Sequence, residues 1–134
     1  MSTLAEMMDS HPATTEQSAP AELVACLEAC RVCAQTCTLC ADACLSEKTV
    51  ADLIACIRAD LNCADICAAT AAVLSRRGGG VETTRALLEA CAVACDRCGR
   101  ECDRHAGHHE HCRICAEACH RCVRACRDLL TALA

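Results

Sequence analysis

Cysteine is the residue type that could carry chemistry in this chain. Of its 134 residues, 18 are cysteine and none is Phe, Tyr or Trp. Thiolate sulfur is a soft ligand that selects Cu(I), Zn(II) or iron–sulfur clusters. Most of the cysteines recur at intervals of three or four residues, which is the spacing of one face of an α-helix. The sequence therefore predicts helices that present sulfur ligands along one side.

The cysteines fall into four runs. The first run advances by 4, 3, 4, 3 and 4 residues, so its members stay within roughly 40° of one line along a helix. We name such a line a thiol stripe. The candidate metal ligands, run by run, are Cys26, Cys30, Cys33, Cys37, Cys40 and Cys44; Cys56, Cys63 and Cys67; Cys91, Cys95, Cys98 and Cys102; and Cys112, Cys115, Cys119, Cys122 and Cys126.

Disulfide bonds are not the expected state of these thiols. The first 24 residues lack the basic and apolar regions of a secretory signal, which predicts a cytosolic protein in a reducing compartment. Along a helix, side chains four residues apart hold their Cβ atoms about 5 to 6 Å apart, whereas a disulfide needs about 3.5 to 4.5 Å. Two metal–sulfur bonds of about 2.3 Å bridge the wider gap. The stripes therefore favour metal binding.

Charge and geometry favour Cu(I) among the soft metals. One Cu(I) per thiolate leaves a buried site near neutral, whereas zinc held by four thiolates is a buried anion, which is costly. Cu(I) also accepts two or three ligands, which suits pairs on straight helices, while zinc and iron–sulfur motifs wrap turns around the metal. We therefore expect many Cu(I) ions, with a zinc buffer or an iron–sulfur protein as the alternatives.

The helices that must position these thiols can be located from the chain breaks. Size predicts one domain, with residues 1–19 as a lead that is partly helical near Leu4, Met7 and Met8, and residues 20–134 as the cysteine-rich part. Four helices are expected, at about 20–45, 49–76, 81–105 and 108–133. Because their connections are short, neighbours run antiparallel. The predicted fold class is all-α, an up-down-up-down four-helix bundle with a cysteine-lined interior.

The two ends of such a bundle differ in composition. One end carries His105 and His108, expected to continue the third and fourth thiol stripes, with His109 and His111 beside them. These histidines are candidate ligands that pass metal to the interior, and the alternative is a solvated polar turn. The opposite end is expected to be closed by Leu23, Leu74, Leu88, Leu129, Leu130 and Leu133.

Acidic residues add two further candidates. Asp60 takes a stripe position between Cys56 and Cys63, as an oxygen ligand or proton acceptor, unless a rotation of the helix exposes it. Glu117 and His120 match the Glu-x-x-His element of di-iron bundles, but both lie well over 90° from the stripe of their own helix. Neither a di-iron site nor a catalytic pocket with nucleophile, base and oxyanion donor is expected, so the protein is predicted not to be an enzyme.

Charge and apolarity narrow the partners. A net charge of −5 and an isoelectric point near 5.6 give no basic surface for nucleic acid. The sequence has no run of about eighteen apolar residues, so we expect no membrane-spanning helix. The second helix carries a further apolar face, made of Val50, Leu53, Ile54, Ile57 and Leu61. This face predicts a homo-oligomer, or else packing against a neighbouring helix or the N-terminal lead.

Taken together, these motifs resemble a known family. Inward-facing Cys-x-x-x-Cys-x-x-Cys repeats on four helices, histidines at one end and no export signal are similar to the bacterial copper storage proteins, in their cytosolic branch, over about residues 20–133. The resemblance implies a homotetramer of bundles that stores many Cu(I) ions, serves detoxification and has no catalytic role. A copper chaperone or a small thiol is the expected donor.

The resemblance also implies which residues bind copper. The eighteen cysteines would be the interior ligands, Asp60 an inner polar ligand, and His105, His108 and His109 the ligands of the open end, with His111 as a further candidate. Exported members guard that end with methionines. Here Met1, Met7 and Met8 all precede the bundle, which favours the cytosolic branch.

Overall fold

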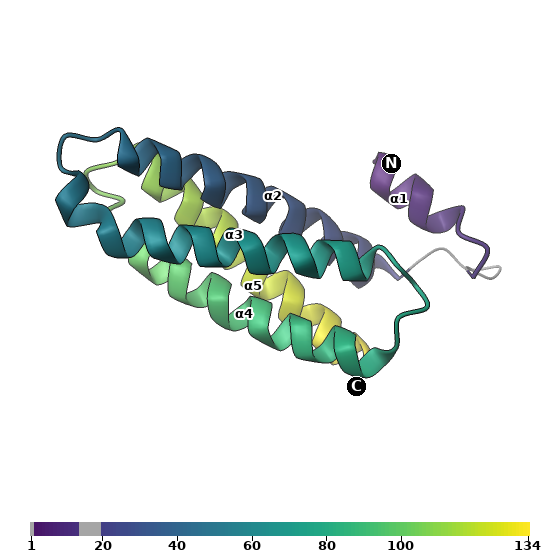
Figure 1. Cartoon of the computed structure of the whole chain (residues 1–134). Coiled ribbons are helices and arrows are strands. Elements are labelled where there is room, and N and C mark those ends of the chain that lie inside the picture. The colour runs from purple at the N-terminus through teal and green to yellow at the C-terminus, as the bar shows by residue number, and fades with distance from the viewer. Residues whose placement is uncertain (1, 14–19) are drawn as a thin grey trace.

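The structure is a computed structural model that describes residues 2–13 and 20–134. Within these residues its helices are α1 (Thr3–Asp9), α2 (Ala21–Leu45), the 3-10 helix η1 (Val50–Leu53), α3 (Ile54–Leu74), α4 (Val81–Asp103) and α5 (Glu110–Ala132). The long helices α2 to α5 alternate in direction and pack side by side as a bundle (Figure 1). The predicted all-α four-helix bundle is confirmed.

Each long helix packs against two others, so the four close around one interior. α2 contacts α3 and α5, and α4 contacts the same two helices. Residues 46–49 and 104–109 lie at one end of the bundle, and residues 75–80 lie at the other. Gly80 ends the second connection with a φ of 89°, a backbone conformation that favours glycine because it has no Cβ. The helix α4 starts at the next residue.

The helix ends differ from the sequence prediction at two places. The expected second helix begins as η1, whose tight winding places Leu53 in the core at 1% exposure, and regular α-helix starts only at Ile54. The helix α4 ends at Asp103, and α5 begins at Glu110. The expectation that His105 and His108 continue two thiol stripes is therefore wrong. Both lie in the turn, where glycine and histidine are weak helix formers.

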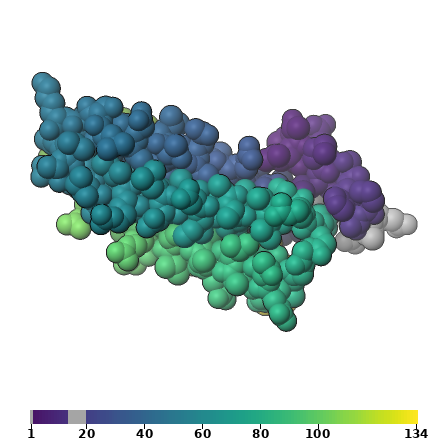
Figure 2. Space-filling model, in the orientation of Figure 1, coloured from purple at the N-terminus to yellow at the C-terminus, as the bar shows by residue number. Residues whose placement is uncertain are grey.

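The N-terminal segment contains the short helix expected near Leu4, Met7 and Met8. Ser2 caps α1, and its side-chain oxygen accepts a hydrogen bond from the Ala5 N–H at 3.1 Å. The Ser2 hydroxyl also donates to Glu28 of α2, and Met8 is buried at 5% exposure. α1 thus rests on the bundle at the end where α2 begins (Figure 2). Residues 14–19 of the predicted lead lie outside the described residues, and the division at residue 19 stays a prediction.

The interior holds sulfur over most of its length and leucine at one end. Every cysteine is fully buried except Cys40, which is 2% exposed. Leu74, Leu88 and Leu129 are buried at the end away from the histidines, and Leu23, Leu130 and Leu133 pack partly buried around them. The expected apolar closure of this end is confirmed.

Among the described residues, α2 is the one helix long and apolar enough to cross a membrane by length and composition, with a mean hydropathy of 1.4. Much of that hydropathy comes from cysteine and alanine. The six cysteines of α2 face the interior of the bundle, as the apolar side of a core helix does. This finding is therefore weak evidence for a membrane span.

Candidate metal centre

The four thiol stripes meet along the axis of the bundle. Sulfur atoms on different helices approach closely: Cys67 and Cys95 at 3.4 Å, and Cys63 and Cys95 at 3.6 Å. Cys33 and Cys119 are 3.8 Å apart. All eighteen thiols are free. We name this continuous array of buried sulfurs the thiol column.

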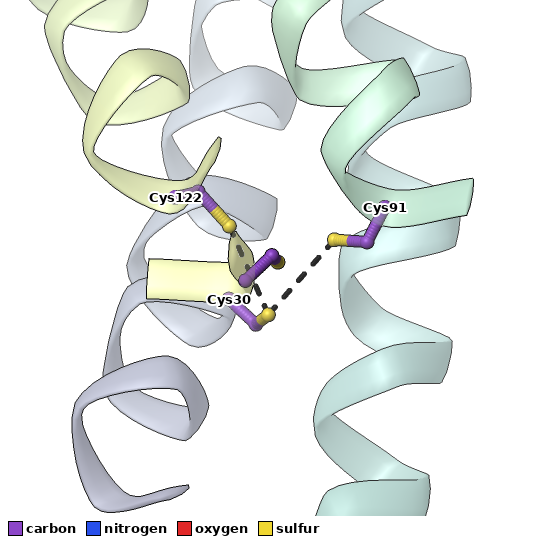
Figure 3. A group of neighbouring side chains, drawn as sticks. Cys30, Cys91 and Cys122 are labelled. Carbon is purple, nitrogen blue, oxygen red and sulfur yellow. Dashed lines mark hydrogen bonds between the residues drawn. The ribbon is translucent and has the colours of Figure 1, made fainter. Parts of the chain in front are cut away.

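Neighbouring candidate metal sites in the thiol column share sulfur atoms, so the column is not divided into separate sites. Groups of four residues, each with its ligand atoms within 4.8 Å of one another, include Cys33, Cys37, Cys63 and Cys119; Cys33, Cys67, Cys95 and Cys122; and Cys37, Cys98, Cys115 and Cys119. Cys33 therefore belongs to two groups, and Cys37 and Cys119 are shared in the same way. Figure 3 shows one link, in which Cys30 lies 3.8 Å from Cys122 and 4.0 Å from Cys91. A metal in one group would bridge to the next through a common sulfur.

The sulfur separations suit direct metal bridges. Two metal–sulfur bonds of about 2.3 Å across a gap of 3.4 to 4.0 Å form an angle of about 95° to 120°, which is that of a metal with three or four ligands. An iron–sulfur cluster adds sulfide and several iron atoms between its cysteines. The close sulfur contacts leave little space for such a cluster without moving the helices.

Asp60 is fully buried inside the thiol column. Its Oδ1 accepts from the thiols of Cys98 at 3.1 Å, Cys115 at 3.3 Å and Cys102 at 3.5 Å. Burial, with the nearby Cys115, raises the pKa of the carboxyl to about 8. The alternative of a rotated, solvent-facing Asp60 is therefore wrong. The carboxyl is neutral near pH 7 and places an oxygen among sulfurs of α4 and α5.

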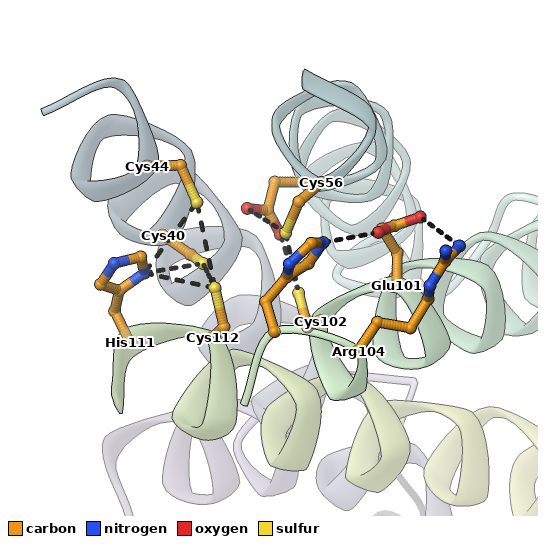
Figure 4. Close-up of polar contacts among 10 residues, drawn as sticks. Cys40, Cys44, Cys56, Glu101, Cys102, Arg104, His111 and Cys112 are labelled. Carbon is orange, nitrogen blue, oxygen red and sulfur yellow. Dashed lines mark hydrogen bonds and ion pairs between the residues drawn. The ribbon is translucent and has the colours of Figure 1, made fainter. Parts of the chain in front are cut away.

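At the histidine-bearing end, which we name the mouth, one histidine reaches the thiols. The Nδ1 atom of His111 lies 3.5 Å from Cys40 Sγ, 3.6 Å from Cys112 Sγ and 4.0 Å from Cys44 Sγ. These four residues form one of the groups with metal-ligand spacing, and they face one another in Figure 4. The other ring nitrogen, Nε2, lies 3.0 Å from Glu47 Oε2. Such an outer carboxylate fixes the ring and leaves Nδ1 directed at the sulfurs.

The other three histidines of the mouth are placed differently. His109 Nδ1 contacts Glu47 Oε2 at 2.6 Å and its ring stacks on His111. His105 Nε2 contacts Glu101 Oε2 at 2.9 Å, and His108 is exposed in the turn. Sequence reasoning thus favoured His105 and His108 over His111. The position of His111 directly before Cys112, the first thiol of its helix, is the signal that would have found it.

Protonation couples to metal binding at the mouth. Burial raises the pKa of Cys44 to about 11 and also raises the pKa of Cys112. The hydrogen bond with His111 lowers the pKa of Glu47, so this carboxylate stays ionised. Both thiols are therefore protonated near pH 7, and a metal that binds them must displace their protons.

The Glu-x-x-His pair lies outside the thiol column, as predicted. Glu117 pairs with Arg113 at 2.8 Å, and His120 Nε2 contacts Asp103 Oδ2 at 2.8 Å across the α4–α5 face. The His120 ring lies over Gly99, where a Cβ atom would come within 2.7 Å of its Cε1. This histidine therefore contributes to the packing of α4 on α5.

Comparison with known proteins agrees with this geometry. Residues 19–131 match the protein family described as copper storage protein. The chain belongs to the copper storage protein family. This membership accounts for a bundle whose four helices all present cysteines to a common axis.

Solved structures of copper storage proteins resemble the chain closely. The copper storage protein from Streptomyces lividans loaded with 10 copper equivalents is 55% identical, with 96% of this chain and 98% of that chain covered and a TM-score of 0.91. A form described as the cytosolic copper storage protein of the same organism with five coppers is 62% identical over 82% of this chain and 92% of that chain, with a TM-score of 0.80.

A more distant relative keeps the same fold. The apo form of copper storage protein 3 from Bacillus subtilis is 37% identical over 79% of this chain and 96% of that chain, with a TM-score of 0.69. The comparison with curated proteins finds no relative.

Proposed function

We propose that the protein stores many Cu(I) ions in the cytosol through the thiolates of the thiol column. The observation that carries this proposal is that neighbouring groups of four ligands share sulfur atoms, such as that of Cys33. Shared sulfurs allow about one metal ion per thiolate. Family membership and the copper-loaded relatives support the same conclusion.

Charge favours Cu(I) over zinc in this interior. One Cu(I) per thiolate leaves the thiol column near neutral, whereas separate zinc tetrathiolates would bury several anions side by side. In the part of the chain that the structure describes, the interior holds no cationic side chain that would offset them, since its buried polar residues are Asp60 and Thr70. A zinc buffer is the second candidate function, and only if few zinc ions bind in each chain.

We assign ligand roles from the contacts. All eighteen cysteines are proposed as interior ligands and Asp60 as an oxygen ligand or proton acceptor among them. His111 is the proposed first ligand at the mouth, with His105 and His109 as further sites of contact for incoming copper. The exposed position of His108 makes it the most peripheral of the predicted ligands.

Loading needs only ligand exchange. Cu(I) bound at His111 passes to Cys40, Cys44 or Cys112, which lie within 4.0 Å of its Nδ1, and then moves from sulfur to sulfur at spacings of 3.4 to 4.0 Å. Each transfer to a thiol releases its proton. The helices keep their places, because the sulfurs already lie within bridging distance. The protein needs no catalytic group for this role, and we propose that it is not an enzyme.

The external apolar side chains support an oligomer. Leu45, Ile54 and Leu61 are 58%, 50% and 47% exposed and lie along one hollow of the surface. Leu53 and Ile57, which were expected on the same face, are buried in the protein's own core. We propose that the remaining exposed part is a contact within a homotetramer, and that a small thiol or a copper chaperone delivers the metal.

Metal content of the purified protein tests the proposal. The protein is produced in cells grown with both copper and zinc and purified without oxygen, and its copper, zinc, iron and acid-labile sulfide are measured. We expect several copper ions per chain, no acid-labile sulfide and no visible colour. Two results would contradict the proposal. One is about one zinc ion per four thiols, with the zinc not displaced by added Cu(I). The other is a brown protein that contains acid-labile sulfide.

A further inference from the structure

A groove runs between α3 and α4 on the outside of the bundle. Its floor consists of small or apolar side chains from both helices, among them Ala55, Ala59, Ile66 and Ala94, and its volume is about 800 Å³. Alanine leaves this space open, because a methyl group does not fill the gap between two helix backbones. Small-molecule sites in proteins have volumes of about 300 to 1,000 Å³. The groove therefore has the size of a ligand site.

Arginine dominates the polar lining of the groove. The four arginines are Arg58 from α3, Arg97 and Arg100 from α4, and Arg104, which directly follows α4. Arg100 pairs with Asp96 at 3.1 Å and Arg104 with Glu101 at 3.5 Å, while both arginine side chains stay more than three-quarters exposed. Among the described residues, Arg58 and Arg97 have no ion-pair partner. The groove is thus a positive site on a chain of net charge −5, and guanidinium groups bind carboxylates in pairs of hydrogen bonds.

One end of the groove adjoins the mouth. Glu101 lines the groove with one carboxylate oxygen near Arg104, and its other oxygen lies 2.9 Å from His105 Nε2. Figure 4 shows Glu101 and Arg104 beside Cys56 and Cys102, whose sulfurs are 3.6 Å apart near the mouth. A small molecule held by these arginines would therefore lie beside His105, on the α3–α4 side of the mouth.

We propose that this groove binds the Cu(I) complexes of small thiols that carry carboxylates and holds them beside the mouth. The inference rests on the proposed copper storage function and names the class of donor. Cu(I) requires a soft carrier ligand such as a thiolate, and the arginines recognise the carboxylates of that carrier. The size of the groove suits a small molecule, whereas the docking of a protein partner usually buries a wider surface.

The transfer balances without any oxidant or reductant. The bond between Cu(I) and the sulfur of the carrier breaks, and a bond between Cu(I) and a cysteine sulfur of the mouth forms. The proton of that cysteine passes to the departing thiolate of the carrier. Copper remains Cu(I) throughout, and the free thiol then leaves the groove.

Loading rates with two carriers test the proposal. The Arg58→Glu/Arg97→Glu variant is compared with Arg124→Glu/Arg127→Glu, which changes the same charge at exposed positions of α5. Anaerobic stopped-flow absorbance follows loading from Cu(I)–mercaptosuccinate, whose carrier has two carboxylates, and from Cu(I)–2-mercaptoethanol, whose carrier has none. We expect the groove variant to load about tenfold more slowly or worse from mercaptosuccinate, with its rate from 2-mercaptoethanol and its final copper content unchanged. The α5 variant should load from both carriers as the original protein does.

Three results would overturn the proposal. Equal slowing in the groove and α5 variants would mean that only overall charge matters, and equal slowing with both carriers would mean that carboxylates are not recognised. A changed mass of the groove variant in light scattering would make the groove a contact between copies of the chain.

Calorimetric titration of the metal-free protein with copper-free mercaptosuccinate separates this proposal from the storage function. Binding that the groove variant loses supports the groove even if copper storage fails. Absence of binding contradicts the groove even if storage holds.

Discussion

The two ends of the bundle are closed in different ways. At the mouth, polar groups meet sulfur: His111 lies against three thiols and is held by Glu47. At the far end, the interior is closed by the buried side chains of Leu74, Leu88 and Leu129. A histidine nitrogen can bind incoming copper, whereas a leucine side chain offers no ligand atom. The difference supports our proposal that copper enters and leaves the thiol column through the mouth, and it gives the far end a role in stability.

The largest expected effect separates the thiol column from the leucine end. In the Cys33→Ser/Cys37→Ser/Cys119→Ser variant, each lost sulfur is shared between neighbouring groups, and serine oxygen is a poor ligand for Cu(I). We expect the copper content, measured by metal analysis after anaerobic loading, to fall by at least about three ions.

Leu88→Ala is the matched change at the far end. It removes a fully buried side chain, so we expect the free energy of unfolding to fall by about 2 to 5 kcal/mol with the copper content unchanged. Unchanged copper content in the triple serine variant would contradict the role of the thiol column.

The second effect concerns the rate of loading at the mouth. His111→Ala removes the nitrogen that lies 3.5 Å from Cys40 Sγ, and we expect anaerobic loading to slow by about tenfold while the final copper content changes by no more than one ion. His120→Ala, outside the thiol column on the α4–α5 face, is the control and should load at the original rate. If both variants load equally fast, the mouth is not the route.

The third effect is the pH dependence of the metal-free protein. Burial raises the pKa of Asp60 from 3.8 to about 8, so the folded state holds this proton more tightly than the unfolded state does. The resulting stability is fully present below about pH 4 and is lost as the pH rises towards 8. Asp60→Asn stays neutral, and we expect it to remove this fall, on the order of a few kcal/mol. Urea unfolding under reducing conditions measures it, and parallel curves for the two proteins would contradict the buried, neutral carboxyl.

The smallest effect concerns the packing of α4 on α5, away from both ends of the bundle. A Cβ at Gly99 would lie 2.7 Å from His120 Cε1, so Gly99→Ala must displace the partly exposed His120 ring. We therefore expect it to add less to the free energy of unfolding than the gain of about 1 kcal/mol that alanine has over glycine in a helix, without changing copper content. In a His120→Ala background the same substitution should give the full gain. An equal effect in both backgrounds, measured by chemical unfolding, would show that the ring is not the obstacle.

The sequence predicted those parts of the protein that repeat regularly. Intervals of three and four residues determine a helix face, so the inward thiol stripes, the position of Asp60 on one of them and the leucines of the far end could be foreseen. The short helix near Met8 was also expected. Each of these features depends on local periodicity, which a single chain displays directly.

The mouth could not be predicted in the same way. The helices α4 and α5 end at Asp103 and begin at Glu110, so helical periodicity says nothing about the direction of His105 or His108. The placement of His111 depends on Glu47, which is 64 residues away in the chain. The start of the second helix as η1 likewise reflects the burial of Leu53 in a tight turn. Contacts between turns decide these features, and of them only the role of His111 has a signal in the sequence, which is its place directly before Cys112.

Anaerobic titration of the metal-free protein with Cu(I) against a chromophoric chelator tests the central claim most directly, because it counts the ions that the shared sulfurs hold. With 18 thiols per chain and sulfurs shared between sites, we predict tight binding of a number of Cu(I) ions comparable to the number of thiols. Saturation at about four ions, the number that separate four-thiol sites would give, would contradict it.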